Sequence, residues 1–302
     1  MIGIISPNQL RDAVSWPDAL IAVRDALVHL AAGRVIQPPA VEISVPGQGE
    51  LHVKGGHVVD DDWIVVKVAT GGFSGGPPTG CLLLVDAITG APAWLLDDRG
   101  RLTLLRTAAA GALATLSFSR HDAQSVLIVG TGDLAAALVE VHAAVAPHLR
   151  ATLWGRDSDR AKFLADRLGV AAAPDLRTTV GAADVILTAT SSRKPLIDAD
   201  WVQPGTHLTA MGADTVGKQE LPVALLERAE VIVCDDVATA LNAGELQHAT
   251  PEIHSRVRAW PDLLSAGPLT RREDAITIAD LCGIGAEDAA IAAAALRGIN
   301  LP

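Results

Sequence analysis

The feature that most constrains the fold of this chain is a strand–turn–helix–strand pattern between Ser125 and Asp157. The apolar run Val126–Val129 leads into the turn GTGDLA, a helical Ala/Leu/Val segment follows, and a second apolar run occupies Ala151–Trp154. A G-x-G-x-x-A turn in this βαβ context is typical of dinucleotide-binding domains. We therefore predict a dinucleotide site at this turn, with a purely structural βα turn as the alternative.

The residues of the turn have separate expected roles. Gly130 permits the sharp bend, Gly132 lets backbone N–H groups reach a pyrophosphate, and the small Ala135 lets the helix pack close to the strand. The anion would lie at the positive end of the helix. The candidate binding residues of the turn are Gly130, Thr131, Gly132, Asp133 and Leu134.

The residues after the second strand bear on the choice between NAD and NADP. Gly155 stands where NAD-selective sites usually carry an acidic residue, Arg156 offers a planar fork for a phosphate, and Ser158 can donate a hydrogen bond. These residues favour NADP(H). NAD(H) stays open as the alternative, in which Arg156 pairs with Asp157 or Asp159 and Asp157 serves the ribose.

Apolar runs continue in the order expected of a doubly wound parallel sheet. The six runs are 126–129, 151–154, 184–190, 207–211, 230–234 and 275–279. Ligands bind at the carboxyl ends of the strands in such sheets. Thr190 and Ser191, at the carboxyl end of the run 184–190, are therefore candidates for the wall beside the nicotinamide.

The first 119 residues follow a different pattern, which predicts a smaller α+β domain. Two helices are expected at 7–32 and 102–119, with Thr103 as N-cap of the second helix and Arg106 in its first turn. Between them, five short runs are typical of antiparallel strands, at 41–45, 51–54, 63–68, 81–86 and 92–96.

The fold class that we predict is α/β, with a Rossmann domain and a smaller α+β domain. A late helix at 287–297 follows the parallel sheet and is expected to pack back on the first domain. The expected boundaries are 1–119, joined by 286–302, and 120–285.

Composition argues against several classes of partner. The net charge of the 302 residues is −11 and basic residues form no cluster, which argues against nucleic acid or an anionic membrane. The longest wholly apolar stretch, Ala289–Leu296, is far shorter than the ~20 residues of a membrane-spanning helix. Three widely spaced cysteines fit a reducing compartment better than a metal site. We expect a cytoplasmic protein without a metal.

Several motifs occur together in an order known from one family. They are VVKVATGG at 65–72, GPPTG at 76–80, LVDAITG at 84–90, LTLLRTAAAGALA at 102–114, GTGDLA at 130–135 and MGADTVGKQE at 211–220. With them the chain resembles the ornithine cyclodeaminase/mu-crystallin family from about Pro38 to Ala294. The most specific parts are LTxxRTAA, GAD-x-x-GK-x-E and the late AEDAAIA.

The resemblance implies a substrate-binding and dimerisation domain, a Rossmann domain and an active site in the cleft between them. It also implies hydride transfer between a nicotinamide and the α-carbon of an amino acid or its imine. By matching position, Lys67 and Arg106 would bind the substrate carboxylate and Asp214 would be the acid/base. The residues implied at the dinucleotide site are Thr79, Asp133, Met211, Gly212, Ala213, Asp214 and Lys218.

The chemistry of these residues agrees with the implied roles and leaves alternatives. Lys67 is flanked by valines, so its charge needs an anionic partner, which is a substrate carboxylate or an internal salt bridge. Arg106 suits a bidentate carboxylate contact or a capping role. Asp214 suits acid/base work or an N-cap of a helix that begins near Gln219.

Two positions depart from the family pattern. Ala40 stands where members commonly carry an arginine that binds the carboxylate, and we expect Lys54 to replace the lost charge. Leu134 stands where a glutamine is usual, which removes a polar contact near the phosphates.

The favoured function is an NAD(P)H-dependent ketimine reductase or amino-acid dehydrogenase that acts on a 2-imino or amino acid and forms a homodimer. One alternative is an ornithine or lysine cyclodeaminase that uses catalytic NAD. The other is a non-catalytic NADPH-binding protein, which the joint presence of Lys67, Arg106 and Asp214 disfavours.

Overall fold

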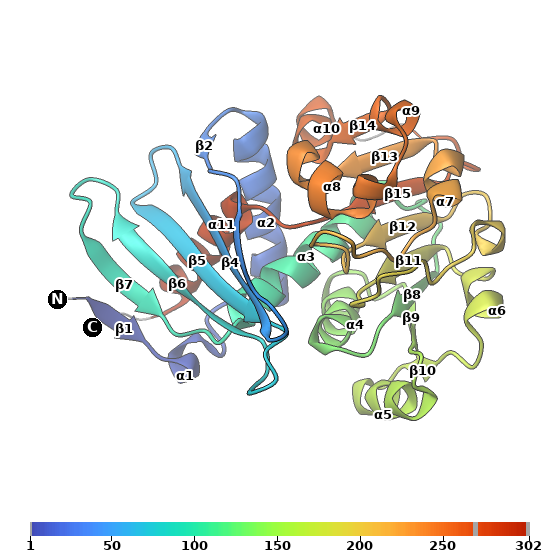
Figure 1. Cartoon of the computed structure of the whole chain (residues 1–302), viewed down its shortest axis with the longest axis horizontal. Coiled ribbons are helices and arrows are strands. Elements are labelled where there is room, and N and C mark those ends of the chain that lie inside the picture. Colours follow the sequence, from blue (N-terminus) through green and yellow to red (C-terminus); the bar gives the residue numbers. More distant parts are fainter. Residues whose placement is uncertain (1, 268–270, 300–302) are drawn as a thin grey trace. The chain divides into compact units, whose positions relative to one another are not determined.

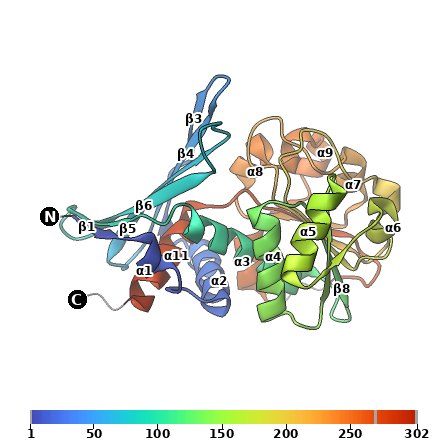
Figure 2. The same ribbon diagram turned by 90° about the horizontal axis from the view of Figure 1, so that it is seen from below.

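The computed structural model describes residues 2–267 and 271–299 (Figures 1 and 2). The described chain forms two compact units, residues 2–106 with 284–299 and residues 107–283. The boundary that we predicted after residue 119 lies one residue past the end of α3 (Arg101–Phe118), whereas the compact units divide within this helix. Within the described ranges, none of the helices is both long and apolar enough to cross a membrane.

The first unit contains a seven-stranded sheet in the order β1-β7-β6-β5-β4-β2, with β3 paired to β4. All pairs are antiparallel except β1 with β7. The five predicted strands are confirmed, although β4, β5 and β6 extend beyond the predicted ranges; β1 and β2 were not predicted. The strands are β1 (Gly3–Ile5), β2 (Val35–Ile36), β3 (Val41–Val45), β4 (Gly49–Val58), β5 (Trp63–Gly71), β6 (Thr79–Asp86) and β7 (Pro92–Leu96).

The predicted helix at 7–32 is two helices, α1 (Pro7–Leu10) and α2 (Trp16–Ala31). The reason is local, because Ser15 is the N-cap of α2 and accepts from the backbone N–H of Asp18 at 3.3 Å. The prediction of Thr103 as N-cap of α3 is wrong. That helix begins earlier, where the Asp98 carboxylate accepts from the Leu102 N–H at 2.8 Å.

The last helix, α11 (Gly285–Gly298), packs on α2, β4 and β5 of the first unit. Glycines permit a close approach to β4. A side chain at Gly285 would overlap the carbonyl oxygen of Gly55, and a Cβ atom at Gly56 would lie 2.6 Å from the carbonyl oxygen of Gly285. The first turn of α11 is therefore held directly against β4, next to Lys54.

The second unit contains an eight-stranded parallel sheet in the order β10-β9-β8-β11-β12-β15-β13-β14. The six predicted strands are confirmed, and the short edge strands β10 and β14 were not predicted. The strands are β8 (Ser125–Val129), β9 (Arg150–Trp154), β10 (Ala171–Ala172), β11 (Val185–Thr188), β12 (His207–Ala210), β13 (Val231–Cys234), β14 (Val257–Ala259) and β15 (Thr277–Asp280).

Helices connect the strands of this sheet, so the predicted fold class, a Rossmann-type sheet domain together with a smaller α+β domain, is confirmed. The α-helices are α4 (Asp133–Val145), α5 (Ser158–Leu168), α6 (Leu176–Val180), α7 (Val223–Arg228), α8 (Val237–Ala243), α9 (Pro251–His254) and α10 (Trp260–Ala266). Short 3-10 turns, η1 (Ala199–Trp201) and η2 (Glu245–His248), complete the connections.

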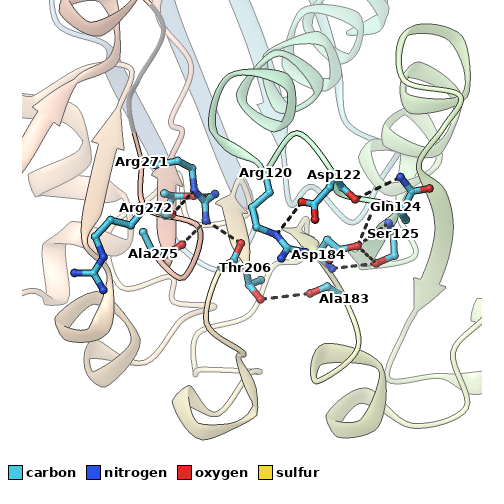
Figure 3. A network of polar contacts seen from close by, with 12 residues as sticks. Arg120, Asp122, Gln124, Ser125, Ala183, Asp184, Thr206, Arg271, Arg272 and Ala275 are labelled. Carbon is cyan, nitrogen blue, oxygen red and sulfur yellow. Dashed lines mark hydrogen bonds and ion pairs between the residues drawn. The ribbon is translucent and has the colours of Figure 1, made fainter.

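A polar network ties the amino ends of the strands together (Figure 3). The Asp184 carboxylate, just before β11, accepts from the Arg120 guanidinium at 2.6 Å and from the backbone N–H groups of Gln124 and Ser125 at 2.9 and 3.1 Å. The Arg271 guanidinium donates to backbone carbonyls at the same edge. These charged groups contact one another or backbone groups of the second unit, and the candidate dinucleotide-binding residues of this unit lie at the opposite, carboxyl edge of its sheet.

Candidate active site

Lys67 and Arg106 meet in a buried charge network of the first unit. The Lys67 ammonium lies 3.0 Å from Oδ1 and 2.8 Å from Oδ2 of Asp288. The Arg106 guanidinium donates from Nε to Oδ1 of Asp288 at 3.0 Å and from Nη1 to Oε2 of Glu287 at 3.1 Å. Each of the four side chains is at most 5% exposed. The anionic partner that we predicted for Lys67 is therefore present within the chain.

The two carboxylates come from the first turn of α11, which the glycine contacts hold against β4. Lys67 lies in the middle of β5, and Arg106 lies in the second turn of α3. Glu287 and Asp288 were not among the predicted site residues. Their signal was the late AEDAAIA motif, in which two acidic residues stand among apolar ones.

A third cation adjoins this network. Lys54 of β4 lies directly opposite Lys67 of β5 in the antiparallel register, so the two side chains share one face of the sheet. Burial, and then the charges of Arg106 and Lys54, lower the pKa of Lys67 to about 7 despite the Asp288 carboxylate. Three basic side chains therefore gather around two carboxylates in this network.

The predicted dinucleotide turn has the geometry that a pyrophosphate requires. Gly130 has φ +147°, and a Cβ atom there would lie 2.5 Å from the Ala189 carbonyl oxygen. The space around the position of a Cβ at Gly132 is open to 4 Å. Gly132 is also the N-cap of α4 and offers no side-chain acceptor, so the first N–H groups of the helix have no side-chain cap. The residues present fit a bound dinucleotide.

The residues after β9 bear on whether Asp157, or Arg156 with Ser158, is available to the adenosine ribose. Asp157 is the N-cap of α5, and its carboxylate accepts from the N–H groups of Asp159 and Arg160 at 3.1 and 3.0 Å. Arg156 and Ser158 are exposed, and in the described part of the chain the Arg156 side chain forms no hydrogen bond or ion pair. The alternative pairing of Arg156 with Asp157 or Asp159 is not observed.

Asp214 and Lys218 contact each other in the loop after β12. The Lys218 ammonium donates to Oδ1 of Asp214 at 2.6 Å, and the Asp214 side chain is 47% exposed. The alternative role of Asp214 as an N-cap is not observed, because the next helix, α7, begins at Val223.

Thr190, Met211 and Gly212 lie at the carboxyl ends of the neighbouring strands β11 and β12, as expected. The Glu220 carboxylate links them, because it accepts from the Thr190 N–H and the Gly212 N–H at 2.7 and 2.8 Å. Ser191 follows Thr190 and is exposed. Glu220 was not a predicted site residue, although it ends the GAD-x-x-GK-x-E motif.

The predicted residues thus form two groups. Lys54, Lys67 and Arg106 belong to the first unit, as does the exposed Thr79 at the start of β6. The glycine turn, the β9 end, and the segments 190–191 and 211–218 belong to the second unit. Among the described residues, no group of three or more His, Cys, Asp or Glu is arranged to hold a metal ion.

The chemistry of the two groups is complementary. One unit offers a cluster of three basic side chains, which suits a carboxylate. The other offers a Rossmann sheet whose glycine turn fits a pyrophosphate, with a carboxylate close to the carboxyl edge. The fold is thus that of a two-domain α/β protein with a Rossmann-type unit and a smaller α+β unit.

Comparison with known proteins identifies the family. The chain belongs to the ornithine cyclodeaminase/mu-crystallin family, whose model matches residues 9–296. A Rhizobium meliloti protein named as a dehydrogenase is 37% identical over 98% of this chain and 95% of its own length. The family that the motifs predicted is therefore confirmed.

Two solved structures are similar along nearly the whole chain. One is an archaeal alanine dehydrogenase dimer with bound NAD, with a TM-score of 0.87, 27% identity and coverage of 98% of this chain and 95% of that one. The other is the iminosuccinate reductase of Paracoccus denitrificans with NAD+, with a TM-score of 0.88, 26% identity and coverage of 98% and 96%.

Proposed function

We propose that this chain is an NAD(P)H-dependent ketimine reductase. Its reverse reaction is that of an amino-acid dehydrogenase. The observation that carries the proposal is the gathering of three basic side chains, Lys54, Lys67 and Arg106, around the first turn of α11. The charges of Arg106 and Lys54 oppose protonation of Lys67, and an added anion would favour it. The carboxylate of a 2-imino acid supplies that anion.

Different residues bind the substrate carboxylate and stabilise the proton of the imine. Arg106 and Lys67, with Lys54 beside them, hold the substrate carboxylate, so the position of C2 is determined before reaction. A bound nicotinamide supplies the hydride that adds to C2. Asp214 stabilises the proton on the imine nitrogen, directly or through water, and Lys218 orients its carboxylate.

The test is oxidation of NADPH and of NADH, measured in parallel with several imino acids. The panel contains Δ1-pyrroline-2-carboxylate, Δ1-piperideine-2-carboxylate, and pyruvate or glyoxylate with ammonia or methylamine. We expect turnover with at least one imine and its loss in Asp214→Asn. Release of ammonia from ornithine or lysine with catalytic NAD, without imine reduction, would make the protein a cyclodeaminase instead. Inactivity in both assays would favour a dinucleotide-binding protein without catalysis.

We further propose NADP(H) as the preferred dinucleotide. The support is that the Asp157 carboxylate is used to cap α5, while Arg156 and Ser158 are exposed beside it. Replacing Arg156 with Ala should raise the dissociation constant for NADPH about tenfold or more, the value of one charge-assisted contact, and leave that for NADH within about twofold. Equal losses for both dinucleotides, measured by fluorescence titration, would contradict the preference.

A homodimer is the proposed assembly. Val41, Ile43 and Val45 of β3 are 54%, 54% and 37% exposed, and their alternation places them on one face of the strand. An exposed apolar strand face is typical of an interaction surface. Light scattering after size exclusion should give about twice the chain mass, and Ile43→Lys should shift the protein toward the monomer. A monomeric wild type would exclude the assembly.

A further inference from the structure

Glu220 is a buried carboxylate that the proposed chemistry does not use. Its side chain is 0% exposed and accepts four hydrogen bonds. Oε1 accepts from the Thr190 N–H and hydroxyl at 2.7 and 2.6 Å, and Oε2 accepts from the Thr188 hydroxyl and the Gly212 N–H at 2.7 and 2.8 Å. The side chain is thus fully engaged inside the second unit.

The donors come from the ends of two neighbouring strands. Thr188 is the last residue of β11, Thr190 lies two residues after it, and Gly212 lies two residues after the end of β12. These two strand ends meet closely, because a side chain at Gly212 would overlap the Thr190 carbonyl oxygen. Glu220 therefore joins the segment predicted to line the nicotinamide to the segment that leads into Asp214.

The backbone of Glu220 is fixed as firmly as its side chain. The Glu245 carboxylate accepts from the N–H groups of Glu220 and Leu221 at 2.7 and 3.0 Å. The Glu220 carbonyl accepts from the Leu196 N–H at 2.8 Å. The backbone of Glu220 is therefore held in place, and its side chain binds both strand ends.

A carboxylate at this place carries a cost to folding. Burial raises the pKa of Glu220, against the effect of its hydrogen bonds with Thr190 and Thr188. A glutamine would fill the same space, but its amide nitrogen cannot accept a hydrogen bond. Whichever way the amide is turned, the N–H of either Thr190 or Gly212 is left without its acceptor.

We propose that Glu220 is a positioning residue, which holds the nicotinamide-side wall at Thr190 and the segment leading to Asp214 in fixed relation. The inference rests on the proposed function. Glu220 acts through these two segments and does not touch the reacting atoms. Its loss should impair the nicotinamide end of the dinucleotide site and leave the adenosine end, at β9 and the glycine turn, intact.

The experiment compares Glu220→Gln with wild type by binding and by turnover. The ligands are NADPH and 2′-phospho-ADP-ribose, which lacks the nicotinamide; NADH and ADP-ribose serve if NADH is preferred. We expect the dissociation constant for the fragment to stay within about twofold, while that for the dinucleotide rises several-fold. We also expect kcat to fall at least tenfold with little change in the KM of the imino acid, because its carboxylate is held in the first unit.

Two further variants make the test specific. Glu227→Gln changes an exposed residue of α7 and should match wild type in every measurement. Thr188→Val removes a single hydroxyl donor to Glu220 without touching a predicted ligand-binding residue, and should give a smaller change of the same kind. It decides the question if Glu220→Gln fails to fold.

The inference is overturned if the variants keep the kcat of wild type and its affinities for both the fragment and the dinucleotide. It is also overturned if the affinity for the fragment falls as far as the affinity for the dinucleotide. If wild type reduces no imino acid, the proposed function fails, whereas the comparison of fragment with dinucleotide still decides the role of Glu220.

Discussion

Lys67 is the residue whose surroundings bear most directly on the proposed carboxylate site of the first unit. Burial and the neighbouring charges of Arg106 and Lys54 oppose its protonation, and Asp288 favours it. The outcome, a pKa of about 7, means that the charge of this site changes near neutral pH. An anionic ligand would add to the influence of Asp288 and favour the ammonium form.

This balance predicts a pH dependence of substrate binding. A carboxylate binds best to the protonated form of Lys67, so its affinity should be constant below pH 7 and fall above it, by up to about tenfold per pH unit. The measurement is the dissociation constant of pyrrole-2-carboxylate, which has no reducible imine, between pH 6 and 9. Lys67→Met should bind weakly without this dependence, and a flat profile in wild type would contradict the assignment.

Lys54 offers a second prediction at this scale. If its charge replaces the family arginine missing at Ala40, Lys54→Met should raise the KM of the imino acid by tenfold or more, since a charge-assisted contact is worth roughly 1.5–3 kcal/mol. The dissociation constant for the dinucleotide should change little. An unchanged KM would exclude Lys54 from substrate binding.

Sequence reasoning located these residues but not their partners. The valines around Lys67 predicted that an anion must lie beside it, and this follows from the cost of burying a lone charge. Asp288 lies 221 residues later, and no spacing rule links positions so far apart. Glu220 was missed for a similar reason, because its partners Thr190 and Gly212 follow two different strands that only the folded sheet brings together.

At the scale of elements, the position of α11 depends on two glycines. Gly56 of β4 and Gly285 of α11 let backbone lie against backbone, and this contact sets where Glu287 and Asp288 lie. A helix held at the usual distance by side chains would not place its first turn so close to β4.

Replacing Gly285 with Ala should therefore weaken the first unit. The added methyl group would overlap the Gly55 carbonyl oxygen, and such overpacking typically costs roughly 1–3 kcal/mol of the free energy of unfolding. The control is Gly75→Ala, where no atom lies within 4 Å of the new Cβ. Chemical denaturation of both variants checks this, and equal stabilities would show that α11 can move away without cost.

Element prediction succeeded where the pattern was long and failed where it was short. The six apolar runs of the parallel sheet carry enough β-branched residues to be recognised, and all six are strands. The strands β2 and β10 have two residues each, too few to show any period. The break after α1 was missed because the apolar spacing continues across Ser15, which caps the following helix.

At the scale of the whole molecule, buried acids make stability depend on pH. Burial raises the pKa of Asp280 to about 7 and that of Glu245 to about 8. The folded protein then holds protons that the unfolded chain releases between about pH 4 and these values. The free energy of unfolding should consequently fall as the pH rises through this interval.

Replacing Asp280 with Asn should remove part of this dependence. Oδ2 accepts from the Leu246 N–H at 3.0 Å, and Oδ1 has no hydrogen-bond partner among the residues that the structure describes, so an amide fits with its oxygen toward Leu246. We expect the variant to be more stable than wild type at pH 8 by roughly 2–4 kcal/mol, because each unit of pKa shift corresponds to about 1.4 kcal/mol. Near pH 4 the two proteins should be equally stable. Denaturation at several pH values checks this, and the exposed Asp166→Asn should retain the wild-type dependence; a loss of stability at pH 8 would refute it.

The return of α11 to the first unit also has a consequence for how the protein is made. During translation, Lys67 and Arg106 emerge from the ribosome long before Asp288, and the whole parallel sheet is synthesised in between. Until the last helix emerges, the nascent first unit lacks the carboxylates that balance its buried cations and the helix that covers β4 and β5. The order of synthesis therefore favours folding of the second unit first, with the first unit completed only after translation of α11.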